Sequence, residues 1–534
     1  MSYAIDFGTS NTVIARWNAA TQKSEILKLS EISQSTSQTP DLIPSLVYVE
    51  NAQTNQVVLG QQVRDRGLDI QNDQRFFKGF KRGIGTSIQG FMPTLDEQAT
   101  SFEQVGKWFI DGVMAKLNAA HPDSRDSLIL TVPVDSFETY RNWLGSVVND
   151  LNIDQVRIID EPTAAALGYD KADKDLILVV DFGGGTLDFA LVQLNNGKQS
   201  NSNQPLGFIL KWGEKSFAEE SGQKIQTARV IAKSGQNLGG TDIDQWILEH
   251  FEKTQNLETT PLTMRLAERL KIQLSLQEKG SEVYFDEETF NSIEMNLSRG
   301  EFETLLKEQS FFERLDTCMN QVLQQAQRQG FQSDDIDAVL MVGGTSQIPA
   351  FQQWVHTYFD ASKVLSHRPF DAIAAGALKL VQGVEVKDFL YHSYGVRFWD
   401  RRQNAHAWHP IIPSGQPYPM TQPMELILGA STDSQPSIEL IIGELGNEMG
   451  GTEVFFDGDR LVTRQIQGNQ SNVQPMNDTK GGRNIAALNP PGYPGSDRIK
   501  VQFWVDDQRS LRITVEDLLT EDLLLENERV ASLS

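Results

Sequence analysis

Residues 176–188 read Leu-Ile-Leu-Val-Val-Asp-Phe-Gly-Gly-Gly-Thr-Leu-Asp, a short apolar strand that ends in an aspartate and three glycines. An apolar run of this length is typical of a sheet strand covered on both faces. Glycines that follow such a strand let backbone N–H groups approach phosphate oxygens, because no Cβ stands in the way. The stretch predicts a phosphate-binding loop at Gly183, Gly184 and Gly185, with a tight hairpin turn as the simpler alternative.

A related pattern stands at the start of the chain, where residues 3–9 read Tyr-Ala-Ile-Asp-Phe-Gly-Thr. Two explanations are open from this pair of stretches alone. The first is a duplicated domain in which each half carries one phosphate loop. The second is a chance recurrence of a common strand–turn pattern.

The carboxylates of Asp6 and Asp181 and a phosphate are all negatively charged, so direct contact between them is unfavourable. The two aspartates therefore predict a hydrated cation between carboxylate and phosphate. Magnesium fits this position because it dehydrates reluctantly and is often held through water. The chain has no Gly-x-x-x-x-Gly-Lys-Ser/Thr motif, which disfavours a P-loop enzyme. No His-Arg-Asp loop precedes the Asp-Phe-Gly at 181–183, which disfavours a protein kinase.

Two more glycine pairs follow the same logic. Gly343 and Gly344 come directly after a strand-like run and before a helix that starts at Pro349. This order predicts that they bind an α-phosphate or a ribose. Gly239 and Gly240 stand at the start of an amphipathic helix. A simple helix-capping turn is the alternative for this second pair.

Alternating strands and helices are expected up to about residue 384, which predicts an α/β architecture. The expected strands are 43–49, 127–132, 176–180 and 338–342. Apolar spacings of three and four predict a helix over 102–117 and one longer helix over 302–326. A further helix is expected over 262–275, with Thr260 as its cap and Pro261 at its first position.

Beyond residue 391 the pattern changes to period-2 strands separated by turn residues, at 437–442, 501–505 and 511–515. Short strands of this kind predict a β-sandwich. The Gly-, Asn- and Pro-rich stretch 465–496 is expected to be a loop.

The composition excludes several classes of protein. The chain has 534 residues, 39% of them hydrophobic, which excludes a fully disordered or collagen-like chain. A net charge of −24 disfavours nonspecific binding to nucleic acid or to anionic membranes. The single cysteine and the absence of a signal-peptide pattern at the start lead us to expect a cytoplasmic protein.

Six motifs in order resemble the DnaK-type seventy-kilodalton heat-shock chaperones. They are Asp-Phe-Gly-Thr-Ser at 6–10, Thr-Val-Pro at 131–133, Ile-Asp-Glu-Pro-Thr-Ala-Ala-Ala-Leu-Gly-Tyr at 159–169, Asp-Phe-Gly-Gly-Gly-Thr-Leu-Asp at 181–188, Leu-Gly-Gly-Thr-Asp at 238–242 and Val-Gly-Gly-Thr-Ser-Gln-Ile-Pro at 342–349. The resemblance implies a two-lobed actin/hexokinase-like nucleotide-binding domain over 1–383, a linker over 384–393 and a β-sandwich substrate-binding-like domain over 394–534. From the sequence we expect no counterpart of the family's helical lid.

The same resemblance implies a slow, magnesium-dependent ATP hydrolase that binds ATP and ADP, and it implies roles for individual residues. Lys81, Glu161, Thr186 and Asp188 would be catalytic, with Asp6 and Asp181 holding hydrated magnesium. Lys78, a neighbour of Lys81, is more simply a surface lysine. The implied nucleotide contacts are Gly8, Thr9, Ser10, Gly183, Gly184, Gly185, Gly239, Gly240, Glu268, Lys271, Ser275, Gly343 and Gly344. Without the resemblance, Glu268, Lys271 and Ser275 would be assigned to a salt-bridged helix face.

The implied partners are unfolded or extended polypeptides, together with a J-domain cochaperone and a nucleotide exchange factor. Pro133 and Arg141 match the family's proline switch and its partner arginine, which relay the nucleotide state to the second domain. The stretch Asp-Phe-Leu at 388–390 resembles the family's connector between the domains.

The sequence departs from the family in the nucleoside pocket. Ile272 and Gln347 stand where many members have arginines that stack on adenine, which removes about 0.5 to 2 kcal/mol of cation–π interaction each. Phe370 replaces a common aspartate. A holdase or co-chaperone of the same fold, in which nucleotide is mainly structural, is therefore the alternative to an ATP-hydrolysing chaperone. A sugar or glycerol-type kinase is a third class, but it leaves the β-rich end unexplained.

Overall fold

The computed structural model describes residues 2–18, 20–36, 39–86, 92–121, 127–133, 138–149, 151, 153, 156–169, 175–195, 209–212, 227–286, 290–382, 390, 393–400, 405–413, 416, 418–420, 422–445, 452–457, 460–465, 473–476, 483–506 and 509–533. The chain divides into two compact units. The first comprises Met1–Lys198, Ile209–Val386 and Glu453–Arg464, and the second comprises Gln199–Phe208, Lys387–Thr452 and Gln465–Ser534.

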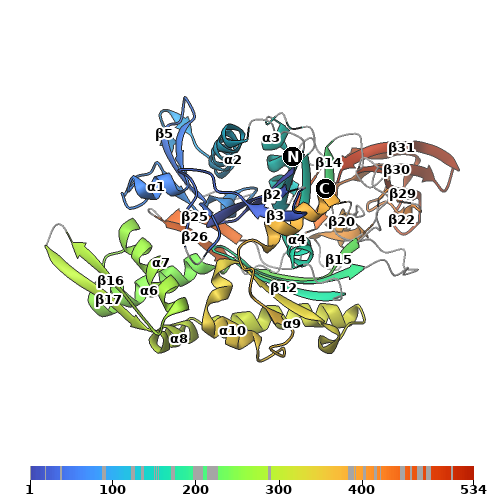
Figure 1. Cartoon of the computed structure of the whole chain (residues 1–534). Helices are drawn as coiled ribbons and strands as arrows, with labels where there is room; N and C mark the ends of the chain where they lie inside the picture. Colours follow the sequence, from blue (N-terminus) through green and yellow to red (C-terminus); the bar gives the residue numbers. More distant parts are fainter. Residues whose placement is uncertain are drawn as a thin grey trace. The chain divides into compact units, whose positions relative to one another are not determined.

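The first unit contains two large sheets, one in each of two lobes (Figure 1). The first-lobe sheet has the order β14-β11-β10-β1-β2-β3, with β4 paired to β2. Its strands are β1 (Ser2–Phe7), β2 (Asn11–Asn18), β3 (Lys23–Ile26), β4 (Ile43–Pro44), β10 (Ser127–Val132), β11 (Val156–Asp160) and β14 (Ile209–Trp212). Helices α2 (Phe102–Ala120) and α3 (Glu138–Asn149) belong to this lobe.

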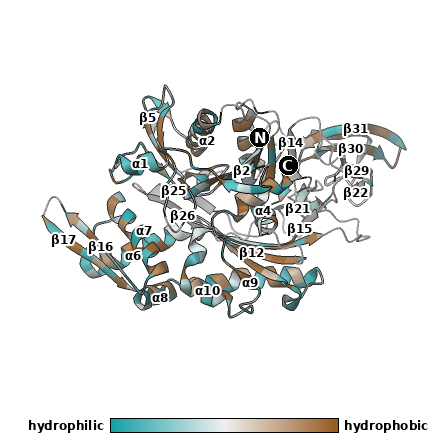
Figure 2. Cartoon of the chain, viewed as in Figure 1, coloured by the Kyte–Doolittle hydropathy of each residue, from teal (hydrophilic) through white to brown (hydrophobic). Residues whose placement is uncertain are grey.

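The second-lobe sheet has the order β15-β13-β12-β18-β19. Its strands are β12 (Leu176–Phe182), β13 (Leu187–Asn195), β15 (Thr227–Gln236), β18 (Ala338–Val342) and β19 (Val364–Leu365). The α-helices of this lobe are α6 (Gly240–Gln255), α7 (Pro261–Leu276), α8 (Arg299–Glu308), α9 (Phe311–Arg328) and α10 (Pro349–Val355). They pack on the sheet through one hydrophobic core, whose apolar residues are brown in Figure 2.

The two sheets repeat one pairing scheme. Strand β1 pairs antiparallel with β2 and parallel with β10, and β12 pairs antiparallel with β13 and parallel with β18. Asp6 and Asp181 each stand one residue before the end of the first strand of their scheme. This shared topology supports a duplicated domain over a chance repeat.

Two helices rich in small residues lie between the sheets of the two lobes. α4 (Glu161–Gly168) and α11 (Ala372–Ala377) lie in a core cluster that also contains strand residues of both sheets. A Cβ added to Gly376 would lie 1.8 Å from the Ala164 carbonyl oxygen, and one added to Gly168 would lie 2.0 Å from that of Ala372. Only glycine allows the two backbones to approach so closely.

Most expected helices are confirmed, and one is wrong. Helix α2 buries the whole predicted stripe from Phe102 to Leu117, and α7 starts at Pro261 with Thr260 as its cap. The single helix expected over 302–326 is two helices, α8 and α9, because Ser310 has a left-handed backbone with φ 51°. Both helices bury their apolar faces in the same core, so the apolar spacing continues across the break.

Smaller elements complete the first unit. In the first lobe they are α1 (Gln61–Asp65), β5 (Leu46–Asn51), β6 (Gln56–Leu59), β7 (Phe76–Lys78), the 3-10 helix η1 (Phe80–Gly83), β8 (Thr94–Leu95) and β9 (Gln98–Ala99). The others are the hairpins β16 (Lys279–Asp286) with β17 (Asn291–Ser298) and β25 (Thr452–Asp457) with β26 (Arg460–Gln465), and the 3-10 helices η2 (Ser333–Asp335), η3 (Gly344–Gln347) and η4 (Leu378–Gln382).

The second unit is built from β-strands around one core, as the period-2 patterns predict. One sheet has the order β21-β20-β24-β27 and another β22-β29-β30-β31, while β23 pairs with β28. The strands are β20 (Ser393–Asp400), β21 (Ala405–Ile412), β22 (Met424–Leu428), β23 (Gln435–Leu440), β24 (Ile442–Leu445), β27 (Val473–Pro475), β28 (Arg483–Gly492), β29 (Ile499–Val505), β30 (Ser510–Asp517) and β31 (Asp522–Ser532).

The loop expected over 465–496 is wrong in its second half, where β28 runs. Ile485, Ala486 and Leu488 are buried there, and their burial outweighs the loop-like composition around them. Most of the predicted linker, 384–389 and 391–392, lies outside the described residues. The predicted boundaries therefore stay predictions.

A buried ion pair stabilises the second unit. Arg498 donates to both carboxylate oxygens of Asp517 at 2.6 and 2.8 Å, and neither residue is more than 5% exposed. These hydrogen bonds lower the pKa of Asp517. Because the folded pKa is depressed, the pair stabilises the fold above a pH of about 4 and loses this effect as the pH falls through the lowered pKa.

Arg498→Met is expected to destabilise the second unit by about 3 kcal/mol, because the Asp517 carboxylate is then buried without its partner. Calorimetric unfolding of the full chain measures this loss. The matched control is Lys500→Met, which breaks a pair between Lys500 and the half-exposed Glu425 and is expected to cost less than about 1 kcal/mol. Equal losses in the two variants would contradict a stabilising role for the buried pair.

Candidate functional site

The first phosphate loop, Gly8 to Ser10, connects β1 to β2 and leaves no room for a side chain at its glycine. A Cβ added to Gly8 would lie 2.3 Å from the Asn11 carbonyl oxygen. Ser45 fixes the loop from outside: its hydroxyl donates to the Gly8 carbonyl at 2.7 Å, and its backbone N–H donates to that of Ser10 at 2.8 Å. The loop is therefore held in shape by the protein itself.

The second loop, Gly183 to Gly185, is a tight hairpin turn that meets the first loop. The Gly183 N–H donates to the Thr186 carbonyl at 3.0 Å, which closes the turn between β12 and β13. A Cβ added to Gly184 would lie 1.9 Å from the Ser10 hydroxyl oxygen. The hairpin and the phosphate-loop interpretations are thus compatible, because the turn places backbone groups against the first loop.

The two other glycine pairs connect to the second loop by hydrogen bonds. The Gly240 N–H donates to the Gly183 carbonyl at 3.0 Å, and the Thr241 N–H donates to that of Gly184 at 3.0 Å. From the turn that contains Gly343 and Gly344, the Thr345 hydroxyl donates to the Gly183 carbonyl at 2.8 Å. Three glycine turns of the second lobe thus form one hydrogen-bonded assembly.

Charged side chains gather beside the loops. Lys81, in η1, donates to the Glu161 carboxylate at 2.9 Å, and the two side chains are 9% and 12% exposed. The Thr131 hydroxyl donates to the Asp6 carboxylate at 2.8 Å. Asp181 lies directly opposite Asp188 in the β12–β13 register.

The electrostatics of this cluster favour a bound cation. Burial and the charge of Glu161 raise the pKa of Asp6 to about 7, although Lys81 and Thr131 act in the opposite direction. Burial, together with Glu161, Asp188 and Asp6, raises the pKa of Asp181 well above its ordinary value. Burial disfavours the charge on Lys81, but the surrounding negative charges outweigh it and raise its pKa.

The residues present therefore fit a hydrated magnesium ion. Asp6 and Asp181 are partly buried carboxylates that repel each other, and a divalent cation between them would relieve that repulsion. Among the described residues there is no group of three His, Cys, Asp or Glu side chains spaced to hold a metal ion.

The α7 side chains expected to contact the nucleoside are bound to protein groups. Lys271 donates to the Gly240 carbonyl at 2.8 Å and pairs with Asp244 at 2.7 Å. Glu268 pairs with Arg64 of the other lobe at 3.1 Å. The Ser275 hydroxyl donates to the Lys271 carbonyl at 3.0 Å, within the helix itself.

Comparison with known proteins identifies the family. The family model described as "Hsp70 protein" matches residues 95–203 and 227–392. The chain belongs to the Hsp70 family. "Chaperone protein DnaK" of Thermosipho melanesiensis is 25% identical over 540 residues, covering 97% of this chain and 78% of that protein. "Chaperone protein DnaK" of Thermotoga maritima is 24% identical over 96% of this chain and 78% of its own length, and "Chaperone protein dnaK1" of Synechocystis is 26% identical over 82% and 57%.

Membership of the Hsp70 family confirms the predicted fold class, an actin-like ATPase domain followed by a β-rich substrate-binding domain. The structure brings together Asp6, Lys81, Glu161 and the glycine loops of both lobes. Lys78, which the sequence analysis interprets as a surface lysine, is exposed. Pro133 is described, but the side chain of Arg141 lies outside the described residues.

Two of the three positions at which the sequence departs from the family, Ile272 and Phe370, carry apolar side chains. Ile272 is 50% exposed on α7. The ring of Phe370 lies against Gly344, where an added Cβ would be 2.9 Å from its Cε1 atom.

Sequence reasoning missed the arginines that join the lobes. Arg82 of the first lobe pairs with Asp242 of the second at 2.8 Å, and Arg265 of α7 pairs with Asp69 at 3.1 Å. In the sequence, only the position of Arg82 next to Lys81 suggests a role for Arg82, and this position does not identify Asp242 as its partner.

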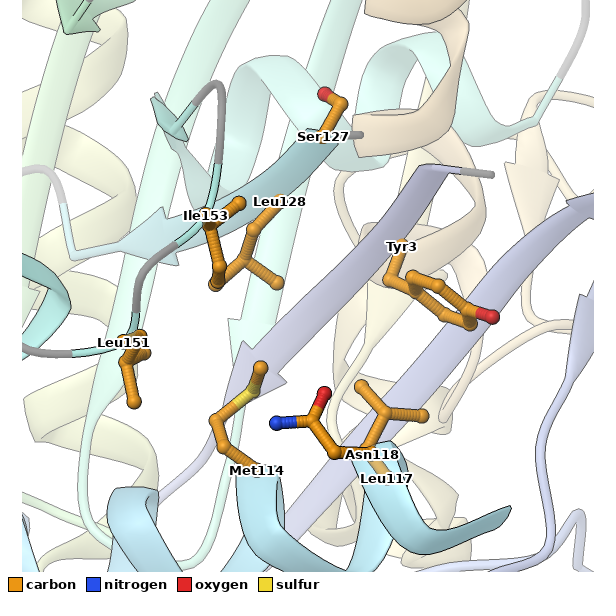
Figure 3. A pocket seen from close by; sticks show the side chains of 8 residues that line it. All are labelled: Tyr3, Met114, Leu117, Asn118, Ser127, Leu128, Leu151 and Ile153. Carbon is orange, nitrogen blue, oxygen red and sulfur yellow. The ribbon is translucent and has the colours of Figure 1, made fainter. Parts of the chain in front are cut away.

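A small hollow lies at the end of the first-lobe sheet where strands β1 and β10 start (Figure 3). It is lined by Tyr3, Met114, Leu117, Asn118, Ser127, Leu128, Leu151 and Ile153. Tyr3 and Leu128 are register partners near the starts of β1 and β10, whereas Asp6 and Thr131 stand near the ends of these strands. The hollow is therefore separate from the phosphate loops. Among the described residues, no helix is long and apolar enough to span a membrane.

Asp181→Asn is expected to raise the unfolding temperature of the nucleotide-free chain and to reduce the further rise caused by magnesium-ADP. The raised pKa means that the ionised carboxylate destabilises the fold at neutral pH, so its removal relieves repulsion while it removes a magnesium contact. Thermal unfolding with and without magnesium-ADP measures both effects.

The control is Asp96→Asn, because hydrogen bonds from Arg75 and the Ala52 backbone lower the pKa of Asp96 to about 2. This variant is expected to unfold at a lower temperature and to keep the full magnesium-ADP response. A full response in Asp181→Asn as well would rule out the magnesium assignment.

Proposed function

We propose that this chain is an ATP-dependent molecular chaperone of the DnaK type, acting in the cytoplasm, whose first unit hydrolyses ATP slowly with magnesium. The observation that carries the proposal is the contact between two glycine loops, one from each lobe, beside a buried lysine and a set of carboxylates. ATP and ADP would bind with their phosphates on Gly8, Thr9 and Ser10 and on the second-lobe loop.

Catalysis would consist of positioning and charge neutralisation, because phosphoryl transfer to water asks little covalent chemistry of the protein. Lys81 keeps its proton, since its pKa is raised, so it acts as a fixed positive charge near the γ-phosphate and the attacking water. Glu161 holds the Lys81 ammonium in place at 2.9 Å. Thr186 and Asp188 complete the surroundings of the water, and magnesium held by Asp6 and Asp181 would neutralise phosphate charge.

The remaining predicted contacts would place the nucleoside. Gly239, Gly240, Gly343 and Gly344 belong to turns that are joined to the second phosphate loop by hydrogen bonds of neighbouring residues. Glu268, Lys271 and Ser275 follow them along α7. Because Lys271 already donates to the Gly240 carbonyl, it supports that turn before any ribose contact is made.

The second unit would bind unfolded or extended polypeptide. Nucleotide state would reach it through Pro133 and Arg141 and through the linker, a two-state element that ATP biases. A J-domain cochaperone and a nucleotide exchange factor are the expected partners of such a cycle, and nucleic acid and membranes are not.

A nucleotide-stabilised holdase or co-chaperone of the same fold is the second candidate. The exposed Ile272 and the ring of Phe370 favour it, because they offer adenine less polar and cationic contact. In such a protein nucleotide would stabilise the first unit without much hydrolysis.

Lys81→Ala is expected to slow single-turnover hydrolysis of ATP by about 100-fold, because it removes the fixed charge closest to the reacting groups. Quenched-flow measurement at saturating ATP gives the rate directly. The control is Lys107→Ala on α2, where Lys107 is 32% exposed and pairs with Asp111; its rate should match the unmodified chain. Equal rates in the Lys81→Ala and unmodified chains would favour the holdase.

Release of a fluorescent unfolded peptide from the full chain is expected to be faster with magnesium-ATP than with magnesium-ADP, because the nucleotide biases the linker element. Stopped-flow displacement measures the two rates. Asp181→Asn serves as the control, since it should make the two rates similar. Identical rates in the unmodified chain would remove the proposed coupling.

A further inference from the structure

Arg82 is a buried cation of the first lobe that reaches the second lobe. It follows Lys81 in η1, and its side chain is only 7% exposed. Its terminal Nη2 nitrogen donates to the Gly185 carbonyl of the second phosphate loop and to the Asp242 carboxylate, the latter at 2.8 Å. A buried guanidinium thus contacts two acceptors of the other lobe.

The Asp242 contact extends to the rest of the second-lobe assembly. The same carboxylate oxygen accepts the Gly239 N–H at 2.7 Å, at the start of α6. The preceding residue, Thr241, donates to the Gly184 carbonyl through both its N–H and its hydroxyl, at 3.0 and 2.8 Å. Arg82 therefore holds two glycine turns that are themselves bound to each other.

The Nε–H group of Arg82 is buried and has no hydrogen-bond partner within the part of the chain that the structure describes. It lies beside the junction of the phosphate loops, since a Cβ added to Gly185 would be 2.8 Å from Arg82 Nε and 2.6 Å from the Thr9 hydroxyl oxygen. An unpaired buried donor of a charged group is costly, so this atom is suited to an acceptor that enters the junction.

We propose that Arg82 is a positioning residue that binds the second phosphate loop to the first lobe and so sets the distance between the two loops when nucleotide binds. This inference rests on the proposed function, in which those loops hold the phosphates. Because Arg82 and Lys81 are consecutive in η1, the same contact also sets the position of Lys81 relative to Gly185.

A lysine cannot replace Arg82 in this role. The guanidinium is planar and presents several N–H groups in fixed directions, whereas an ammonium is a compact charge on a flexible stem. Arg82→Lys keeps the charge but loses the geometry, and Arg82→Gln loses both. The pair of variants therefore separates charge from positioning.

The test compares Arg82→Lys, Arg82→Gln and Asp242→Asn in the full chain. The readouts are KM and kcat for ATP, the release rate of a fluorescent ADP and the unfolding temperature without nucleotide. We expect Arg82→Lys to release ADP about 10-fold faster and to raise KM by a similar factor, with an unchanged unfolding temperature, since hydrogen bonds to charged groups have this magnitude. The double variant Arg82→Gln/Asp242→Asn should match Arg82→Gln alone, because both changes break the same contact.

The control is Arg66→Gln, which breaks an exposed pair between Arg66 and Glu50 and should leave all readouts unchanged. A lower unfolding temperature with unchanged KM and ADP release in Arg82→Lys and Asp242→Asn would overturn the proposal, because it would show a merely structural role. ADP release does not require hydrolysis. Faster release in a chain that hydrolyses no ATP would therefore support the role of Arg82 while it refutes the proposed ATPase.

Discussion

The structure of the first unit depends on the close approach of a glycine turn of the second lobe to the loop that connects β1 and β2 in the first lobe. Gly184 and Gly185 lie against Ser10 and Thr9, at distances where an added Cβ would overlap a hydroxyl group. Any other residue would push the loops apart or strain their turns. The glycines thus form the junction of the two loops, and the charged residues are arranged around it.

The charges around the junction are unbalanced in a way that suits a polyphosphate with its cation. Asp6 and Asp181 are partly buried and have raised pKa values, and Lys81 is kept charged by the carboxylates around it. The carboxylates at the junction repel one another, whereas in the second unit the buried charges of Arg498 and Asp517 are paired with each other. Unfavourable electrostatics concentrated in one junction is a mark of a binding site.

Much of the first unit was predictable because its signals are local. The strand, aspartate and glycine order around Asp181 predicts the loop, and the apolar stripe from Phe102 to Leu117 predicts a buried helix that the structure confirms. The break at Ser310 was not predictable, because a left-handed serine leaves the apolar spacing of α8 and α9 unchanged. The contacts that Arg82 and Arg64 make with the other lobe were not predictable either, since each of those partners lies more than 100 residues away and is brought close only by the fold.

The crossing of α4 and α11 determines how the two lobes are able to move. Gly168 and Gly376 already lie at the limit of backbone approach, so the two helices cannot move closer to each other. The side chains that the two helices place in this core cluster are mostly alanines. The close contact favours a change of angle between the lobes over a change of distance at this crossing. The crossing lies beside the phosphate loops, because α4 begins at Glu161, the partner of Lys81, and Phe370, two residues before α11, lies against Gly344, so a change of angle at the crossing acts directly on the glycine turns.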